Sequence, residues 1–273
     1  MHGTYRRPCT YEQGTLGPNF SDMPPRTIAA IFDLDGTLVQ TEALKARSYA
    51  RAAVELSPLT VRAQEIIVAY DDMVGHAREE VAAALLVRFG LEAAATQRMG
   101  ALGATSPLDA YMMLRLAIYE AMIADDRLIR EQEYPWSTAL LRAVRREGYP
   151  VGIATMSHRK HAVLVLERLG LTDQVDVLVT REDVREAKPS PEIYLLIASM
   201  LGAATGDCFV LEDSVPGVRA ATAAGMRCVA ITNDMTRDAV HAARVLPNAR
   251  VVDDPATLDH AARAVLQDLA RAR

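Results

Sequence analysis

The sequence lacks long apolar runs, has few cysteines and carries no excess of positive charge. No apolar stretch approaches the roughly 18 residues that cross a membrane, and Arg6 and Arg7 are not followed by the apolar segment of a secretory signal. The three cysteines, Cys9, Cys208 and Cys228, lack the spacing of metal ligands. The net charge of −5, from 30 basic and 35 acidic residues, argues against a broad nucleic-acid surface. We therefore expect a cytoplasmic protein that binds neither membranes nor nucleic acid.

The texture of the sequence changes twice along its 273 residues, which leave room for one large domain or two small ones. Residues 1–26 are rich in glycine and proline and have no periodic apolar pattern, which predicts a loose tail. Met23, within this tail, is a candidate for the true first residue of the protein. An apolar strand is expected over 27–32. Residues 40–130 are then rich in Ala, Leu, Arg and Glu at helical spacing, without a convincing strand.

From Pro135 to the end, strands alternate with helices, which is typical of a parallel sheet with helices on both faces. The predicted strands lie within 150–156, 175–180, 207–213, 226–232 and 249–254. The first strand is separated from these partners by the long helical stretch. We therefore predict an α/β fold in which a Rossmann-like parallel sheet carries an α-helical insertion. The predicted segments are a tail at 1–26, a core at 27–39 and 135–273, and a helical domain at 40–134.

Polar residues follow several predicted strands, at the carboxyl edge where open parallel sheets bind ligands. They are Asp33 and Asp35 after the first strand, Thr155, Met156 and Ser157 after the second, Glu212 and Asp213 after a later one, and Lys188 in a loop. Four carboxylates brought together would repel each other strongly unless a cation lies among them. Oxygen ligands favour a hard divalent ion such as Mg²⁺, which also binds phosphate. The lysine and the threonine hydroxyl suit phosphate oxygens.

The pair of aspartates after the first strand suits phosphoryl transfer. A carboxylate such as Asp33 can attack phosphorus and form an acyl phosphate. The carboxylate two residues further on, Asp35, can then handle the proton of the leaving or attacking oxygen. A lone Asp-x-Asp-Gly sequence is more often a simple turn or helix cap, so this interpretation depends on the other strand ends.

The chain resembles the haloacid dehalogenase-like superfamily of phosphotransferases. The sequences "DLDGT", "ATMS", "AKPSP" and "LEDS" follow each other in the order of the four motifs of that superfamily, over roughly 27–252. The helical stretch is similar to its small cap domain. The resemblance implies Asp33 as nucleophile, Asp35 as general acid and base, and Lys188 as the residue that orients the nucleophile and the phosphate.

The resemblance also implies the remaining ligands. Thr155 and the backbone amide of Met156 would bind phosphate. Asp33, the backbone carbonyl of Asp35, Asp213 and Glu212 would hold Mg²⁺, and Glu212 remains open as a residue behind the direct ligands. Ser214 is interpreted as the cap of the next helix.

Substrate residues in the cap are expected from the stretch "MVGHAREEV". Gly75 and Arg78 match the cap loop of sugar-phosphate members of the superfamily, so Arg78 is a candidate for the part of the substrate away from the reacting phosphate; an exposed helix arginine is the alternative. Lys45 stands where similar β-phosphoglucomutases carry a histidine. His158 and Arg159 follow the second motif. They either lie at the border of the ligand-binding site or are simple surface residues.

We predict a Mg²⁺-dependent phosphatase for a small phosphorylated metabolite, with a sugar phosphate favoured, acting through an aspartyl-phosphate. The alternative enzyme is a β-phosphoglucomutase-like phosphomutase, and Lys45 in place of histidine speaks against it. A receiver-like phosphoacceptor is a non-enzymatic alternative, but receivers need only ~120 residues and carry no cap. A nucleotide-binding module is disfavoured because no glycine-rich phosphate loop follows a strand. A monomer is favoured, and the substrate itself is not specified by the sequence.

Overall fold

The computed structural model describes residues 27–57, 59–73 and 78–272. The predicted tail at 1–26 and the candidate substrate residue Gly75 lie outside these residues. No helix within the described part of the chain is both long enough and apolar enough to cross a membrane.

The described chain falls into two compact units. The first, called here the α/β unit, comprises the chain up to Thr37, Pro135–Arg159 and the residues from Thr172 on. The second, the helical unit, comprises Leu38–Tyr134 and Lys160–Leu171. All of the residues expected at the carboxyl edge of the sheet belong to the α/β unit.

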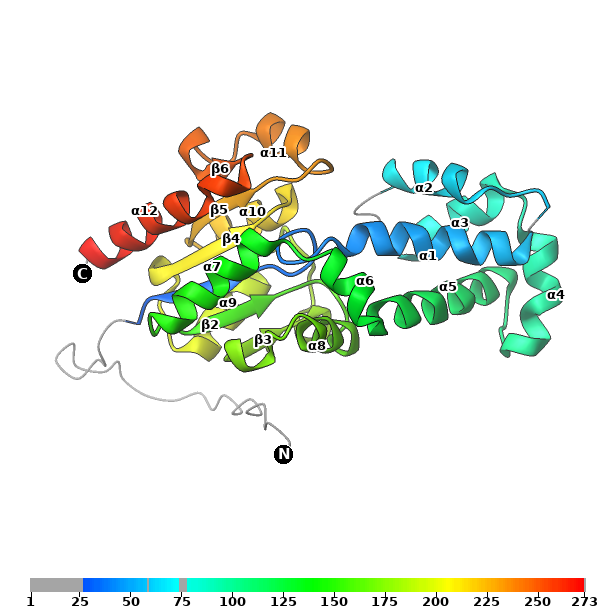
Figure 1. Ribbon diagram of the computed structural model, residues 1–273, viewed down its shortest axis with the longest axis horizontal. Coiled ribbons are helices and arrows are strands. Elements are labelled where there is room, and N and C mark those ends of the chain that lie inside the picture. The colour runs from blue at the N-terminus through cyan, green and yellow to red at the C-terminus, as the bar shows by residue number, and fades with distance from the viewer. Residues whose placement is uncertain (1–26, 58, 74–77, 273) are drawn as a thin grey trace. The chain divides into compact units, whose positions relative to one another are not determined.

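The α/β unit is built on a sheet with the strand order β3-β2-β1-β4-β5-β6, in which every neighbouring pair is parallel (Figure 1). The strands are β1 (Ala29–Phe32), β2 (Val151–Ala154), β3 (Val177–Val179), β4 (Cys208–Glu212), β5 (Arg227–Ile231) and β6 (Val251–Val252). Most of their residues are buried and apolar, as expected for a parallel sheet that is covered on both faces. Each strand lies within a segment predicted from the sequence, and the predicted Rossmann-like α/β class is confirmed.

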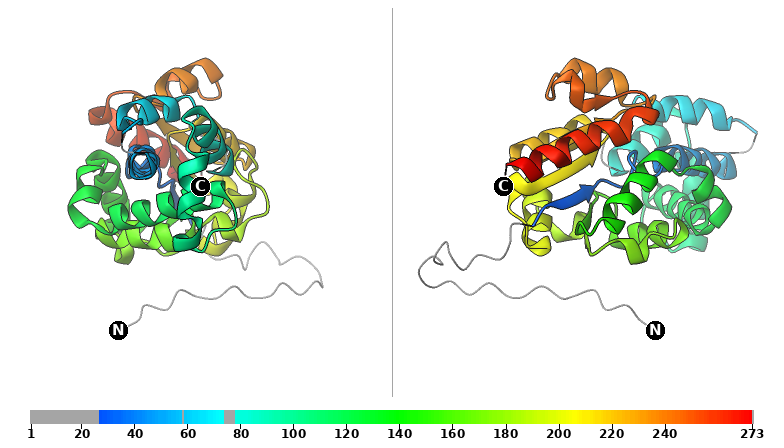
Figure 2. Two further views of the ribbon diagram at one scale, coloured as in Figure 1. Left: turned by 90° about the vertical axis from the view of Figure 1, so that its right-hand side faces the viewer. Right: turned by 60° about the vertical axis from the view of Figure 1, so that its left-hand side comes forward.

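Helices cover the two faces of this sheet (Figure 1 and Figure 2). Helices α7 (Pro135–Arg146) and α12 (Leu258–Arg271) pack against each other, while α9 (Glu192–Leu201) and α10 (Val215–Ala223) form a second packed pair. Alternate residues of β1, Ala29 and Ile31, enter the core that α9 and α10 help to form, because successive side chains of a strand point to opposite faces. The shorter elements are α11 (Arg237–Ala243), η2 (Thr172–Gln174), η3 (Arg181–Asp183), η4 (Thr205–Asp207), η5 (Asn248–Arg250) and η6 (Pro255–Thr257).

The helical unit packs its helices around buried tyrosines and small apolar residues. Its helices are α1 (Thr41–Leu56), α2 (Ala63–Asp71), α3 (Arg78–Arg88), α4 (Glu92–Leu102), α5 (Pro107–Ala124), α6 (Asp126–Glu131) and α8, which begins at Arg159 and ends at Arg168. The ring of Tyr49 lies 5.5 Å from that of Tyr70 and 6.1 Å from that of Tyr111, between centroids. These contacts join α1, α2 and α5 into one core.

Helix α8 departs from the predicted segmentation. It follows β2 in the chain and was expected in the α/β core with the rest of 135–273, yet its residues from Lys160 on belong to the helical unit. The reason is its packing on α5. The ring of His161 stands edge-on to Tyr119 at 5.4 Å, and the Nζ atom of Lys160 lies 2.7 Å from a carboxylate oxygen of Glu120.

Candidate active site

The register of the sheet places the ends of three strands side by side. The last residue of β1 pairs with Ile153 of β2 and with Leu211 of β4. The residues that come next, Asp33, Ala154 and Glu212, therefore stand at one level of the carboxyl edge. The backbone amide of Asp33 donates to the carbonyl of Leu211 at 3.0 Å and holds Asp33 at this edge. The edge is where parallel sheets bind ligands.

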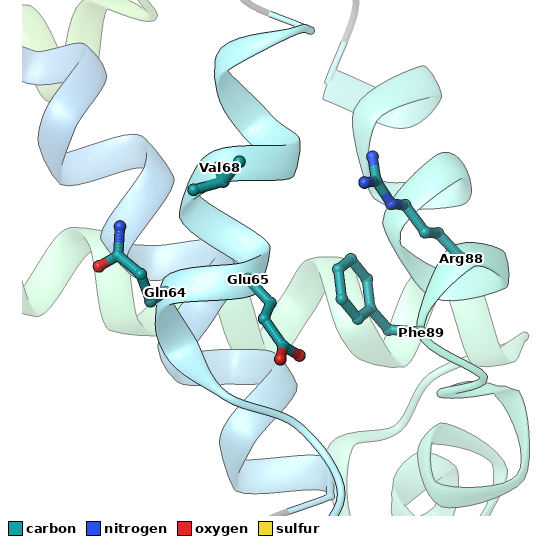
Figure 3. Close-up of a pocket in the computed structure, with 5 residues that line it drawn as sticks. All are labelled: Gln64, Glu65, Val68, Arg88 and Phe89. Atoms are coloured by element: carbon teal, nitrogen blue, oxygen red, sulfur yellow. The ribbon is translucent and has the colours of Figure 1, made fainter.

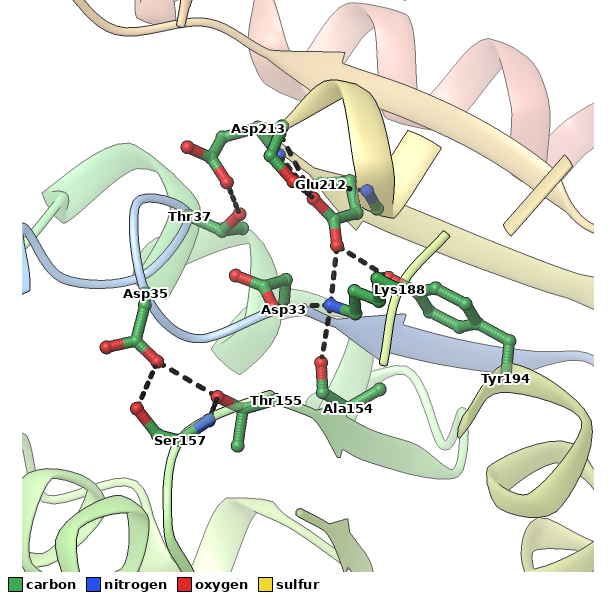
Figure 4. Close-up of polar contacts among 12 residues, drawn as sticks. Asp33, Asp35, Thr37, Ala154, Thr155, Ser157, Lys188, Tyr194, Glu212 and Asp213 are labelled. Atoms are coloured by element: carbon green, nitrogen blue, oxygen red, sulfur yellow. Dashed lines mark hydrogen bonds and ion pairs between the residues drawn. The ribbon is translucent and has the colours of Figure 1, made fainter. Parts of the chain in front are cut away.

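Lys188 links these strand ends (Figure 4). Its Nζ atom donates at 2.6 Å to Asp33 Oδ1, at 2.6 Å to Glu212 Oε1 and at 3.0 Å to the carbonyl of Ala154. The ammonium also lies 5.2 Å from the centroid of the Tyr194 ring. Burial lowers the pKa of Lys188, but the two carboxylates more than offset it, so the pKa stays above its ordinary value. Lys188 is therefore a fixed positive charge beside Asp33.

Glu212 is surrounded by hydrogen-bond donors. Its Oε1 atom accepts from Lys188 and from the hydroxyl of Tyr194, the latter at 2.8 Å. Its Oε2 atom accepts from the backbone amides of Asp213 and Ser214, at 3.0 and 3.1 Å, and from the Ser214 hydroxyl at 3.1 Å. Burial raises the pKa of Glu212, but Lys188 and these donors bring it below its ordinary value. Glu212 is thus an ionised carboxylate with both oxygens engaged.

Asp213 occupies a different setting. Its Oδ1 atom accepts from the Thr37 hydroxyl at 3.4 Å, and its Oδ2 atom accepts from the side-chain amide of Asn233 at 3.1 Å. Asn233 also donates to the carbonyl of Gly36 at 3.3 Å, which ties the loop after β1 to the loop after β5. Gly36 approaches Asp213 so closely that a Cβ atom there would lie 2.2 Å from Oδ2.

Asp33, Glu212 and Asp213 form a cluster that fits a metal ion. One oxygen from each lies within 4.8 Å of the others, and all three residues are buried. Burial, only partly offset by Lys188, raises the pKa of Asp33 to about 8. Burial, together with Glu212 and Asp33, raises the pKa of Asp213 well above its ordinary value. Lys188 supplies one positive charge for three buried carboxylates, so this all-oxygen set suits an additional hard cation such as Mg²⁺.

Asp35 faces the loop after β2 (Figure 4). Its Oδ2 atom accepts hydrogen bonds from the hydroxyls of Thr155, at 2.9 Å, and Ser157, at 2.7 Å. The Thr155 hydroxyl in turn accepts from the backbone amide of Ser157 at 3.0 Å. Met156, between them, is partly buried and its side chain packs on the core. Thr155 therefore contacts the expected acid and base, in addition to its predicted role toward phosphate.

The other candidate residues after the second motif contact the acidic residues of η3. His158 Nδ1 lies 2.7 Å from an oxygen of Glu182, and the guanidinium of Arg159 pairs with Asp183. The backbone amide of Arg159 also donates to Glu182 at 3.1 Å. These pairs join the start of α8 to η3.

The candidate substrate residues of the helical unit lie on α1 and α3. Lys45 pairs with Glu42 at 2.5 Å, and Glu42 also accepts from the hydroxyl of Tyr70 at 2.6 Å. Arg78 opens α3, is partly buried, and its carbonyl accepts from the Tyr49 hydroxyl at 3.2 Å.

Four polar residues in the described part of the chain join the site without having been assigned a role from the sequence: Thr37, Ser157, Tyr194 and Asn233. Ser157 and Asn233 both follow strands, so the rule that selected Asp33 and Glu212 also applied to them. Tyr194 lies in α9 at an apolar position of the helical pattern, and only its buried hydroxyl, which requires a partner, points to a polar role.

A separate cavity of about 400 Å³ lies on the helical unit. It is lined by Gln64, Glu65, Val68, Arg88 and Phe89 (Figure 3). None of the candidate site residues lines it.

The sequence matches the haloacid dehalogenase-like hydrolase family over residues 29–225. Because this match covers well over half of the chain, the protein belongs to that family. The predicted resemblance is confirmed, and so is the prediction of an enzyme of this superfamily.

Individual relatives and a solved structure agree with this assignment. The chain is 30% identical to phosphoglycolate phosphatase of Rhodospirillum rubrum over 84% of its own length and 88% of that protein. It is 27% identical to β-phosphoglucomutase of Bacillus subtilis over 74% and 82%. A crystal structure of a haloacid dehalogenase (HAD) family hydrolase from Deinococcus radiodurans, with bound phosphate and sodium, superposes on this chain with a TM-score of 0.63 at 25% identity. The superposition covers 90% of this chain and 98% of that one. Five further relatives match this chain over shorter stretches. In each of these matches the chain spans half of the relative's length or less.

Proposed function

We propose that the protein is a Mg²⁺-dependent phosphatase that hydrolyses a small phosphorylated metabolite, with sugar phosphates as the favoured class. The observation that carries this proposal is the arrangement around Asp33. This buried carboxylate ends β1, is bonded to the ammonium of Lys188, and lies at the same edge as Asp35, Glu212 and Asp213. A phosphate at this edge would meet a nucleophile, a cation and an acid.

In the first step, an Asp33 oxygen attacks the phosphorus atom of the substrate and forms an aspartyl-phosphate. The bond between phosphorus and the leaving oxygen breaks, and that oxygen takes a proton from Asp35. Lys188 keeps the nucleophile oriented and offsets negative charge that develops on the phosphoryl oxygens. Thr155 and the backbone amide of Met156 bind the phosphoryl group.

In the second step, Asp35 takes a proton from a water molecule, whose oxygen attacks the phosphorus of the aspartyl-phosphate. The bond between phosphorus and Asp33 breaks, and inorganic phosphate leaves with the Asp33 carboxylate restored. Asp35 thus returns to its protonated form for the next substrate.

Asp33, Asp213 and the backbone carbonyl of Asp35 would hold Mg²⁺. When bound, the ion would neutralise charge on the phosphoryl oxygens. The donors to both oxygens of Glu212 support a role behind these ligands, in which Glu212 fixes Lys188 and the backbone of Asp213. With this assignment, Glu212 is no longer counted among the direct Mg²⁺ ligands that the sequence allowed.

We further propose that residues 40–134 act as a cap that selects the substrate, with Arg78, Gly75 and Lys45 as its specificity residues. The protein is proposed to be cytoplasmic and monomeric. Similarity to β-phosphoglucomutase keeps a phosphomutase as the second candidate. Both reactions need Asp33, Asp35 and Mg²⁺, so they differ in whether water or a sugar meets the phosphorylated Asp33.

The test is a phosphatase screen over phosphorylated metabolites with and without Mg²⁺, followed by one discriminating assay. The enzyme is incubated with β-glucose 1-phosphate and a trace of the 1,6-bisphosphate, and inorganic phosphate and glucose 6-phosphate are measured. Net release of phosphate without a need for the bisphosphate is expected. Rapid formation of glucose 6-phosphate with little free phosphate would establish the mutase instead.

A further inference from the structure

We propose that Ser157 is a positioning residue that holds the acid and base Asp35 in place while Thr155 binds the phosphoryl group. This inference rests on the proposed function and divides the work of two neighbouring hydroxyls. It starts from a ring of hydrogen bonds that the motif sequence alone does not predict.

The ring joins three residues (Figure 4). The hydroxyls of Ser157 and Thr155 both donate to the Oδ2 atom of Asp35, at 2.7 and 2.9 Å, and the backbone amide of Ser157 donates to the Thr155 hydroxyl at 3.0 Å. The single proton of each hydroxyl is therefore committed to Asp35. Both bonds go to one carboxylate oxygen, so together they set the direction of the carboxyl group.

Substrate binding must change this ring. The proposed function assigns the Thr155 hydroxyl to a phosphoryl oxygen, and one hydroxyl proton cannot be donated to Asp35 and to phosphate at once. Once Thr155 turns to the phosphoryl group, Ser157 is the member of the pair that still donates to Asp35 Oδ2. Ser157 thus keeps the acid oriented at the stage when its proton is needed.

Ser157 is itself well anchored. Its carbonyl accepts from the backbone amide of Arg181 at 3.3 Å, and its amide is bonded within the ring. The residues that follow are tied to η3, because the amide and the guanidinium of Arg159 bond Glu182 and Asp183. Held on both sides, the Ser157 hydroxyl has little freedom to follow Asp35 elsewhere, which suits a residue that positions another.

The test compares two substrates with different needs for an acid. An alkyl phosphate requires a proton on its leaving oxygen, whereas p-nitrophenyl phosphate does not. In Ser157→Ala, kcat/KM for the alkyl phosphate should fall by ~10–100-fold, since a small misplacement of a catalytic group costs up to about that much. For p-nitrophenyl phosphate the loss should be less than about threefold, because acid help contributes little there. Ser157→Thr should restore most of the lost activity, and Ser199→Ala, on the exposed side of α9, should change neither substrate.

A double-mutant cycle then asks whether Ser157 acts through Asp35. In an Asp35→Asn background, Ser157→Ala should cause no further selective loss of the alkyl phosphate. A loss that persists there would mean that Ser157 contacts the substrate itself, and equal losses on both substrates would mean a general structural role; either result overturns the inference. These outcomes leave the phosphatase intact, whereas a wild-type protein that hydrolyses no phosphomonoester would overturn the proposed function and this inference together.

Discussion

Replacing Gly36 with alanine should weaken Mg²⁺ binding by displacing Asp213. Gly36 has a φ of +93°, and a Cβ atom at this position would lie 2.2 Å from Asp213 Oδ2 and 2.7 Å from its Cγ. Ordinary contact begins at 3.4 Å, so the oxygen must retreat by the difference of 3.4 and 2.2, or 1.2 Å. Metal ligands tolerate deviations of only about 0.2 Å. The Asp213 carboxylate would therefore lose its place among the proposed ligands.

The expected magnitude is a rise of at least ~10–100-fold in the Mg²⁺ concentration for half-maximal activity, the loss seen when groups that merely orient metal ligands are changed. The substitution also carries a backbone cost of ~1–2 kcal/mol for a non-glycine residue at positive φ. The assay is a Mg²⁺ titration of phosphatase activity, paired with a melting temperature measured in EDTA.

Gly148 provides a matched control. It has a φ of +88°, but a Cβ atom there would meet nothing within 4 Å. Gly148→Ala should lower the melting temperature through backbone strain and leave the Mg²⁺ requirement unchanged. An unchanged Mg²⁺ requirement in Gly36→Ala, with a stability loss equal to that of Gly148→Ala, would refute the displacement of a metal ligand.

The remaining predictions concern the charges around Asp33. Lys188→Met should destabilise the metal-free protein by ~3–5 kcal/mol in urea unfolding, because it leaves buried carboxylates without their cation. The control Lys160→Met removes an exposed lysine from its pair with Glu120 and should cost less than ~1 kcal/mol. Equal losses of stability in the two variants would contradict the reasoning. Gly217→Ala would place a Cβ atom 1.8 Å from Glu212 Oε1 and should destabilise the protein by at least ~1–3 kcal/mol. Gly206→Ala is the control, because a Cβ atom there would meet nothing within 4 Å, and it should not cause such a loss of stability. Since burial raises the pKa of Asp33 to about 8 and that of Asp213 well above its ordinary value, the metal-free carboxylates retain protons near neutrality. Mg²⁺ binding should therefore release protons and strengthen as pH rises toward about 8, and calorimetric heats that do not vary with the buffer's protonation enthalpy would argue against this.

The strand ends could be predicted from the sequence because they follow from a simple pattern. Apolar runs followed by polar residues mark where buried strands reach the ligand-binding edge, and parallel register brings Asp33 and Glu212 to one level. The hydrogen bonds of the site could not be predicted in the same way. Whether Thr155 donates to phosphate or to Asp35 depends on one rotatable hydroxyl, and the path of the loop after β2 decides that Ser157 reaches the same oxygen.

Tertiary packing decided two further features that pattern alone leaves open. Tyr194 fits the apolar face of α9 like any core aromatic, and its role toward Glu212 depends on the two elements meeting at the right distance. Helix α8 has a clear helical pattern, but its sequence does not state which neighbour covers its buried side. The contact of His161 with Tyr119 settles that, and it joins residues far apart in the chain.

The placement of α8 limits how the helical unit can be exchanged between related proteins. The chain passes from one unit to the other at four places, after Thr37, Tyr134, Arg159 and Leu171. A graft of 38–134 alone would carry away Tyr119 and Glu120 but leave behind His161 and Lys160, which bond or pack on them. The helical unit therefore cannot be exchanged as the single segment 38–134. Recombination that replaces the helical unit must also change the side of α8 that packs on α5, and substitutions on α5 and α8 are expected to arise in pairs.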